Sequence, residues 1–462
     1  MFKRREKQKK PRTRGKAAPA RQAALDALLR SGEDKVFLDE SLQHVLGSYS
    51  LSGRDRNLAM EIAYGTTRFR KRLDFVLNVH VNQGLDSLPP PVIEILRLSV
   101  YQIQYLTKTP DFAVVNDAVE LTRRAGCGGL SRVVNGVLRS ILRGSRSIEY
   151  PQWEDDPAGH LEVVHSHPPH LVETWLKRWP GEKVHDLCRF NNQKASVFGR
   201  INRLPPHGNS VSAELLHEFP PYPSVPNCVC LDSAESPVQL TQFSEGRLTI
   251  QDPAAMLVAP LLAPEPGMRV WDVCAAPGGK CTHMAELMDD RGTIVGSDLS
   301  LKRLKAVQEN TVRLKLNSVK TVAADGLRPP WKEPNSLFDG VLLDVPCTGW
   351  GTFRRHPVLR WRLHPNDPER LGARAFRLLS SVSGYVRPGG VLVYSTCTLS
   401  EEENEAPVRR FLECHPDWAV EPVTPWLPEP FRDMVTADGW IVVFPPDAGT
   451  DGLFAARLRR NG

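Results

Sequence analysis

The sequence predicts a multidomain protein in which an all-α N-terminal domain and a small α+β connector precede a C-terminal α/β domain. The chain of 462 residues is longer than one compact core usually accommodates. Residues 17–145 carry apolar residues at helical spacing and few strand signals. In residues 246–462, short apolar strands alternate with amphipathic helices, which predicts a doubly wound, Rossmann-like parallel sheet.

The N-terminus is strongly basic. Residues 1–16 hold nine Lys and Arg residues against the single acid Glu6, a net of +8, so the rest of a chain of formal net charge +6 is near −2. Such a segment is either a disordered tail that seeks phosphates or a solvated terminus that only aids solubility. The charge alone does not choose between these interpretations.

The N-terminal domain, residues 17–145, is expected to contain five to seven helices. Ser52 and Asp55 form a capping-box pattern at a helix start. A very apolar segment, Val92–Leu106, follows three prolines and predicts a helix that is buried on most sides. Further helices are expected over Phe112–Arg124 and Ser131–Leu142.

The connector, residues 146–245, is interrupted by many prolines. Leu171–Trp179 is typical of a short helix, and Val197–Arg203 of a strand. The nine cysteines of the chain are scattered, and none forms a C-x-x-C pair. We therefore expect reduced thiols in a cytoplasmic protein with no metal site. No apolar run of about 18 residues exists, so no membrane span is expected.

The C-terminal domain is expected over residues 246–462. Its predicted strands are Arg269–Val273, Thr293–Gly296, Val319–Ala323, Phe338–Leu343 and Val391–Ser395. Its predicted helices are Lys280–Met288, Leu301–Leu314 and Ala373–Val386. Ligands of such sheets bind at the carboxyl ends of the strands, so the residues that follow each strand are the candidates for a site.

Small residues fill the loop after the first of these strands, which consists of Cys274, Ala275, Ala276, Pro277, Gly278, Gly279 and Lys280. The loop matches neither G-x-G-x-x-G nor the phosphate-binding pattern, which disfavours a dinucleotide or a nucleoside triphosphate. Asp298 ends the second strand, where an acid can accept both ribose hydroxyls of a nucleoside. Asp325 follows the third strand, within reach of an adenine edge.

Two cysteines follow the next two strands. Asp344-Val345-Pro346-Cys347-Thr348-Gly349-Trp350-Gly351 follows one, and Tyr394-Ser395-Thr396-Cys397-Thr398 follows the other, with Glu401, Glu402, Glu403 and Asn404 behind it. A lone cysteine after a strand is usually a small buried apolar residue. Two at adjacent strand ends, on the edge that carries a nucleoside site, indicate chemistry instead.

These three motifs resemble those of the RNA cytosine-5 methyltransferases of the NOL1/NOP2/Sun family. The N-terminal half, with Arg54-Asp55-Arg56, Tyr64-Gly65-Thr66 and Asn135-Gly136-Val137-Leu138-Arg139, is similar to the NusB-like RNA-binding domain. The combination resembles the bacterial 16S rRNA methyltransferases of that family. The resemblance implies S-adenosylmethionine as cofactor and a 16S rRNA cytosine, position 967 in the usual numbering, as target.

A thiolate that adds to carbon 6 of cytosine makes carbon 5 nucleophilic toward a methyl group. Spacing alone does not decide whether Cys347 or Cys397 attacks. The resemblance implies that Cys397 attacks and that Cys347 helps to release the product. It also implies that Asp344 contacts the cytosine N3/N4 edge and that Lys280 positions the base. The cofactor is expected to be bound by the loop Cys274–Lys280 with Asp298, Asp325 and Asp344.

Two alternatives stay open at this point. The same enzyme class methylates tRNA or large-subunit rRNA, and a non-catalytic RNA-binding assembly or antitermination factor could carry the same helical domain. We expect a monomer that acts on free or early-assembly 16S rRNA and contacts no membrane. Arg354, Arg355 and His356 are expected either to grip the RNA backbone or to form a solvated loop, and Trp350 either to stack on a base or to pack.

Overall fold

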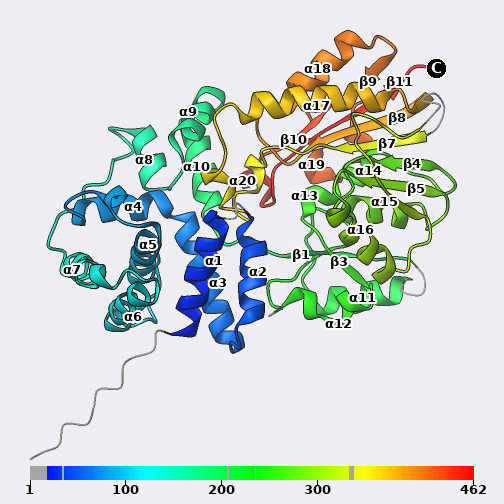
Figure 1. The fold of residues 1–462 in the computed structure, drawn as a ribbon. Helices are drawn as coiled ribbons and strands as arrows, with labels where there is room; N and C mark the ends of the chain where they lie inside the picture. The colour runs from blue at the N-terminus through cyan, green and yellow to red at the C-terminus, as the bar shows by residue number, and fades with distance from the viewer. Residues whose placement is uncertain (1–17, 34–35, 205–207, 235, 332–337) are drawn as a thin grey trace, which may run out of the picture. The chain divides into compact units, whose positions relative to one another are not determined.

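The computed structural model describes residues 18–33, 36–204, 208–234, 236–331 and 338–462. The chain forms two units (Figure 1). The first ends at Asn192 and also includes His356–Trp361, and the second comprises Gln193–Arg355 and Arg362–Gly462. The expected basic tail, residues 1–16, lies outside the described residues. No helix in the described part of the chain is both long and apolar enough to cross a membrane.

The first unit is helical throughout its described residues, and seven of its α-helices fall within the predicted all-α domain. They are α1 (Pro19–Glu33), α2 (Leu38–Ser48), α3 (Gly53–Arg68), α4 (Arg70–His80), α5 (Pro90–Tyr105), α6 (Asp111–Arg124) and α7 (Ser131–Leu142), with 3-10 turns η1 (Leu85–Ser87), η2 (Gly128–Leu130) and η5 (Leu359–Trp361). This confirms the predicted class of the N-terminal domain. The ends of α5, α6 and α7 lie within a residue or two of those expected.

The central helix of this unit is α5, which packs against α1, α3, α4, α6 and α7. Val92, Ile95 and Leu96 are completely buried on it, as its apolar sequence predicts. The predicted cap is also present, because Ser52 Oγ accepts a hydrogen bond from the Asp55 backbone N–H at 3.1 Å at the start of α3. Local sequence signals therefore predict most of the helices of this bundle.

The stretch 146–245, predicted as one connector domain, is divided between the two units. Its helices α8 (Pro157–Val163), α9 (Pro169–Arg178) and α10 (Gly181–Asn191) belong to the first unit, where α8 packs on α4. Its strands belong to the second unit and form an antiparallel sheet of order β2-β1-β3. The strands of this sheet are β1 (Phe198–Ile201), β2 (Cys228–Cys230) and β3 (Leu248–Ile250). The helical elements between them in the chain are α11 (Gly208–Glu218), η3 (Pro237–Gln239) and α12 (Thr241–Ser244). The helices α8 to α10 therefore belong to one unit and the strands to the other, and no single connector domain forms.

The second unit is built on a larger sheet of order β10-β11-β8-β7-β4-β5-β6, with β9 paired to β11. Its strands are β4 (Arg269–Asp272), β5 (Thr293–Asp298), β6 (Val319–Ala323), β7 (Phe338–Asp344), β8 (Val386–Thr396), β9 (Trp418–Val420), β10 (Ile441–Val443) and β11 (Leu453–Arg460). The strands β4 to β8 are parallel, as predicted. The sheet as a whole is mixed, because β11 runs antiparallel to β8, β9 and β10.

Helices cover both faces of this sheet (Figure 1). They are α13 (Pro253–Met256), α14 (Val258–Leu261), α15 (Gly279–Leu287), α16 (Leu301–Arg313), α17 (Asp367–Ser383), α18 (Glu405–Cys414), α19 (Glu429–Arg432) and α20 (Pro445–Ala448), with η4 (Trp350–Thr352) and η6 (Thr424–Trp426).

Side-chain alternation along the strands builds the two cores. Val270 on β4 joins the core formed with α14, α15 and α16, whereas its neighbour Trp271 joins the core formed with α17 and α18. Parallel strands buried on both faces bring their carboxyl ends to one edge of the sheet. The loops that follow β4, β5, β6, β7 and β8 therefore meet there, and they carry the predicted site.

Candidate active site

A cavity of about 400 Å³ lies at the carboxyl edge of the large sheet. The predicted site residues that line it are Cys274, Ala276, Asp298, Asp325, Asp344, Cys347 and Cys397. These residues come from five different loops and are up to 123 positions apart in the chain, from Cys274 to Cys397. The fold therefore brings the cofactor loop, the acids and both thiols to one hollow.

The two cysteines are in direct contact. Cys347 Sγ and Cys397 Sγ lie 3.4 Å apart, and both are half-buried free thiols. The parallel pairing of β7 with β8 sets Asp344 opposite Ser395, so the loops that follow begin side by side. The hydrogen bond with Cys397, and then burial, raise the pKa of Cys347 well above its ordinary value. Cys347 therefore keeps its proton at neutral pH.

Asp344 is held on both sides. Lys280 Nζ donates to Asp344 Oδ2 at 2.6 Å, and Ser395 Oγ donates to Oδ1 at 2.7 Å. Burial lowers the pKa of Lys280, but the charge and the hydrogen bond of Asp344, together with the interactions with Cys397 and Asp272, outweigh burial, and the net shift is upward. Lys280 therefore stays protonated, and the carboxylate is fixed with lone pairs left to face the cavity.

Glu403 ties the two cysteine loops together, a function that the sequence motif does not disclose. Its carboxylate accepts hydrogen bonds from Thr348 N at 2.8 Å and from Thr348 Oγ1 at 2.5 Å. Thr398 Oγ1 lies 3.4 Å from the same carboxylate and 2.7 Å from Thr348 Oγ1. Thr348 and Thr398 directly follow Cys347 and Cys397. Burial raises the pKa of Glu403 to about 7, because the charged form loses its hydration.

Backbone contact reinforces this arrangement. Gly351 N donates to Cys397 O at 3.0 Å, and Gly452 N donates to Gly351 O at 2.8 Å. A Cβ atom on Gly351 would lie 2.6 Å from Gly452 Cα and 2.8 Å from Cys397 O. Only glycine lets the chain pass so close to the Cys397 loop.

The cofactor loop turns sharply into α15. Gly278 has φ +107° at the helix start, and a Cβ there would lie 3.1 Å from Val307 Cα. Ala275 packs into the core. Five residues of the predicted loop do not line the cavity: Ala275, Pro277, Gly278, Gly279 and Lys280. Lys280 is connected to it through its hydrogen bond with Asp344.

Carboxyl groups lie at and near the part of the cavity formed by the ends of β4, β5 and β7. Asp298 is 4% exposed, accepts from Ser300 N at 2.9 Å, and pairs with Arg303 at 3.3 Å. Arg303 also donates to Ala276 O at 2.9 Å, a brace that nothing in the sequence marks. Asp272 is 1% exposed, and neither of its carboxylate oxygens has a hydrogen-bond partner among the described residues. Burial, and then the charge of Asp344, raise the pKa of Asp272 to about 8.

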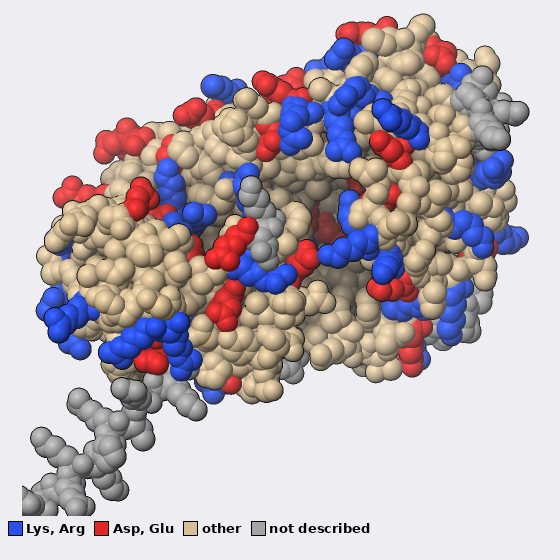
Figure 2. Space-filling view, in the orientation of Figure 1, with Lys and Arg blue, Asp and Glu red and all other residues tan. Residues whose placement is uncertain are grey.

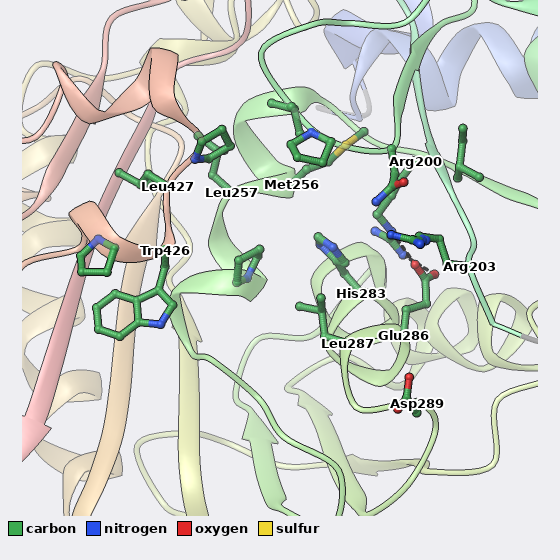
Figure 3. A pocket seen from close by; sticks show the side chains of 17 residues that line it. Arg200, Arg203, Met256, Leu257, His283, Glu286, Leu287, Asp289, Trp426 and Leu427 are labelled. Carbon is green, nitrogen blue, oxygen red and sulfur yellow. Dashed lines mark hydrogen bonds and ion pairs between the residues drawn. The ribbon is translucent and has the colours of Figure 1, made fainter. Parts of the chain in front are cut away.

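A larger cavity of about 590 Å³ lies elsewhere in this unit, and none of the predicted site residues lines it (Figure 3). At one end Arg200, 2% exposed, pairs with Glu286 on α15 at 2.8 Å. Arg200 also donates to Gly279 O at 2.9 Å. This buried pair braces the first turn of α15 and hence the cofactor loop from behind.

The structure corrects the expectations for the loop after Cys347. Arg355 is neither solvated nor free to bind phosphate, because it pairs with Asp252 at 2.9 Å and with Asp451 at 3.0 Å. Arg354 and Trp350 are buried at 5% and 3% exposure, so Trp350 packs rather than stacks on a base.

His356 of the same loop belongs to the first unit, where it pairs with Asp39 at 2.9 Å.

Figure 2 shows basic and acidic side chains interspersed over the face that it draws.

Comparison with known proteins agrees with the motifs and the fold. The 16S rRNA methyltransferase RsmB/F family matches residues 259–459, and the NusB family matches residues 18–143. The crystal structure of PH0851 is similar over 96% of this chain and 99% of its own, with a TM-score of 0.80 and 26% identity.

Curated relatives cover almost the whole chain. A protein of Synechocystis sp. named probable ribosomal RNA small subunit methyltransferase B is 36% identical over 96% of this chain and 99% of its own. A Bacillus subtilis protein of the same name is 34% identical over 97% of this chain and 100% of its own. With the motifs, the parallel sheet and the paired thiols in place, the chain belongs to the RsmB/F family of 16S rRNA methyltransferases.

Proposed function

We propose that this protein transfers a methyl group from S-adenosylmethionine to carbon 5 of a cytosine in 16S rRNA, with Cys397 as a covalent nucleophile. The proposal depends on one observation: a cavity is lined by two thiols 3.4 Å apart, by Asp344, which Lys280 binds from behind, and by Cys274 and Ala276 of the glycine-rich loop. The relatives' names support small-subunit rRNA over tRNA or large-subunit rRNA as the substrate.

The residues around the cavity fit a cationic cofactor. Burial, and then the negative charges of Asp344 and Asp298, raise the pKa of Asp272, so these three acids disfavour one another's ionisation. A sulfonium or ammonium group among them would offset that effect. When bound, S-adenosylmethionine supplies an electrophilic methyl group. Asp298 would hold the ribose hydroxyls and Asp325 the adenine edge, while the small side chains of the loop Cys274–Lys280 let the backbone approach the cofactor.

The nucleophilic step belongs to Cys397. Its thiolate adds to carbon 6 of the cytosine, and the electron pair of the 5,6 double bond makes carbon 5 nucleophilic. Cys347 keeps its proton, so its S–H can donate toward the Cys397 sulfur. The ammonium of Lys280 interacts with Cys397 and places a positive charge beside the thiolate.

Release reverses the addition. After methylation the carbon 5 proton passes to a base, and the electron pair of that bond expels the Cys397 sulfur from carbon 6. Cys347, in contact with that sulfur, assists this step. Asp344, fixed by Lys280 and Ser395, binds the N3/N4 edge of a cytosine that has left its stack.

The test is methyl transfer from labelled cofactor to unassembled 16S RNA. We expect incorporation by the wild type and none by Cys397→Ala. Bisulfite sequencing of rRNA from a deletion strain should show one unmodified cytosine that the wild-type gene restores. Labelling of tRNA or large-subunit rRNA instead would show that one of these RNAs, and not 16S rRNA, is the substrate. If the wild type labels no RNA but still binds it, the protein is a non-catalytic assembly factor.

We also propose in which oligomeric state, in which compartment and on which form of the RNA the reaction takes place. The enzyme acts as a monomer in the cytoplasm, on free or early-assembly RNA, where the target base can still be extruded. Comparing naked 16S RNA with complete small subunits tests this part. Faster methylation of complete subunits would contradict it.

A further inference from the structure

Three histidines of the first unit converge on one point. His160 lies on α8, His165 follows the end of α8, and His185 lies on α10. One ring nitrogen of each lies within 4.8 Å of those of the others, and all three side chains are half-buried. The spacing of the cysteines predicts no metal site in this chain, but His160 and His165 have the H-x₄-H spacing that zinc sites use.

The distance between two of the rings matches that between ligands of one ion. His165 Nε2 and His185 Nε2 lie 3.2 Å apart. Zinc–nitrogen bonds of about 2.0–2.1 Å in a tetrahedral site separate the ligand nitrogens by roughly 3.3–3.4 Å. Two ring nitrogens at this distance can therefore share an ion with little movement.

A second contact orients the third ring. His160 Nδ1 lies 2.9 Å from the backbone oxygen of Pro151. A carbonyl oxygen only accepts, so Nδ1 carries the proton and Nε2 has a free lone pair. Histidine ligands of metals commonly donate their other N–H to such a carbonyl, which fixes the tautomer and the ring orientation.

Burial and the neighbouring charges act together on two of the rings, His165 and His185. Burial, and then the neighbouring His185 and His160, lower the pKa of His165 to about 4, and burial also lowers the pKa of His185. Arg72 and Arg189 act in the same direction, while Asp186, paired with Arg189 at 3.2 Å, opposes them at His185. Neutral imidazoles are the form that binds metals.

We infer that His160, His165 and His185 form a binding site for a divalent transition-metal ion. Three imidazoles without a thiolate or carboxylate suit zinc and its neighbours in the first transition row. Half-burial leaves a fourth position for water. The ion would join α8, the turn after it and α10, and thereby stabilise this part of the helical unit.

Zinc titration of the full-length protein, prepared without a histidine tag and stripped with a chelator, tests the site. Competition with a chromophoric chelator should give one zinc per chain. His160→Asn, His165→Asn and His185→Asn should each weaken binding at least about tenfold, because each removes a ligand. His44→Asn, at an exposed position on α2, is the matched control and should bind as the wild type does.

Two further readouts guard against a folding artefact. Circular dichroism of the metal-free variants should match the wild type, and zinc should raise the melting temperature of the wild type and of His44→Asn only. In the wild type, zinc should also protect the three histidines from diethyl pyrocarbonate. Binding of less than one zinc per chain, or binding of zinc by the three ligand variants with the affinity of the wild type, overturns the inference.

Discussion

Cys347 and Cys397 have different surroundings although their sulfurs lie 3.4 Å apart. The contact and burial hold the proton on Cys347, whereas Cys397 lies beside the ammonium of Lys280. Glu403 fixes the residues that follow both cysteines, so the separation of the sulfurs depends on this carboxylate. A single buried acid thereby supports a site built from two strands.

Glu403 should also make stability depend on pH. Burial raises its pKa from 4.5 to about 7 in the folded protein. The folded value lies above the unfolded one, so this group stabilises the fold fully below about pH 4.5, and that contribution is lost as the pH rises through about 7. Glu403→Gln stays neutral, so its stability relative to the wild type should rise by about 3 kcal/mol between pH 4 and pH 8.

Thermal or urea unfolding across this pH range measures the difference. The variant also loses hydrogen-bond acceptors, which shifts its stability by a constant and leaves the pH dependence as the readout. Glu401→Gln, at a 58% exposed side chain, is the control and should follow the wild-type profile. Parallel profiles for Glu403→Gln and the wild type would show that the carboxyl ionises as freely in the folded state as in the unfolded one.

At the level of elements, the parallel pair β7 and β8 sets the distance between the thiols, and Gly351 keeps the following loops together. Gly351→Ala places a Cβ 2.6 Å from Gly452 Cα and 2.8 Å from Cys397 O. The backbones must then separate, which should cost about 1–3 kcal/mol of stability. Methyl transfer should fall by more than the loss of folded protein explains, because Cys397 shifts with its loop.

Gly384→Ala is the matched control for this change. Gly384 follows α17 with φ −63°, and a Cβ there meets nothing within 4 Å. Stability and methyl transfer should therefore stay close to those of the wild type. Equal activity of both alanine variants per folded molecule would show that the Gly351 contact does not position Cys397.

The sequence predicts the parallel strands β4 to β7 and the helices α15 and α16 within two residues, because period-two and helical patterns are local. The strand β8 begins five residues before its expected start, and the helix α17 begins six residues before its own. The sequence does not predict β9 to β11. The strands β9 and β10 have only three residues each, too few for a period, and β11 is defined by its pairing with β8 about sixty positions earlier. The connector was predicted as one domain because proline breaks do not show which core each helix or strand joins.

The residues of the site likewise divide into those that local sequence patterns predict and those that they do not. Cys347, Cys397 and Asp344 are predictable because residues after parallel strands must meet at one edge. Glu403, Arg200 and Arg303 act through long-range contacts that no local pattern records. Arg355 was misjudged because its partners, Asp252 and Asp451, lie about one hundred positions away in the chain.

For the whole molecule, charge is concentrated in residues 1–16, which carry a net +8, while the rest is near −2. Neutralising phosphates releases counterions, so this segment should steepen the salt dependence of RNA binding. A variant with its nine Lys and Arg residues changed to Gln should bind 16S RNA more weakly, with a shallower slope of log affinity against log salt. Its methylation rate at saturating RNA should match the wild type. An unchanged slope would leave the segment only a solubilising function.

The central claim is that two adjoining thiols of one cavity divide attack from release. Cys347→Ala, incubated with 16S RNA and S-adenosylmethionine, tests it most directly on a denaturing gel. We predict a shifted, denaturant-stable protein–RNA band for Cys347→Ala, and none for Cys397→Ala or for the double variant. A stable band from Cys397→Ala, or none from Cys347→Ala, would contradict the assignment.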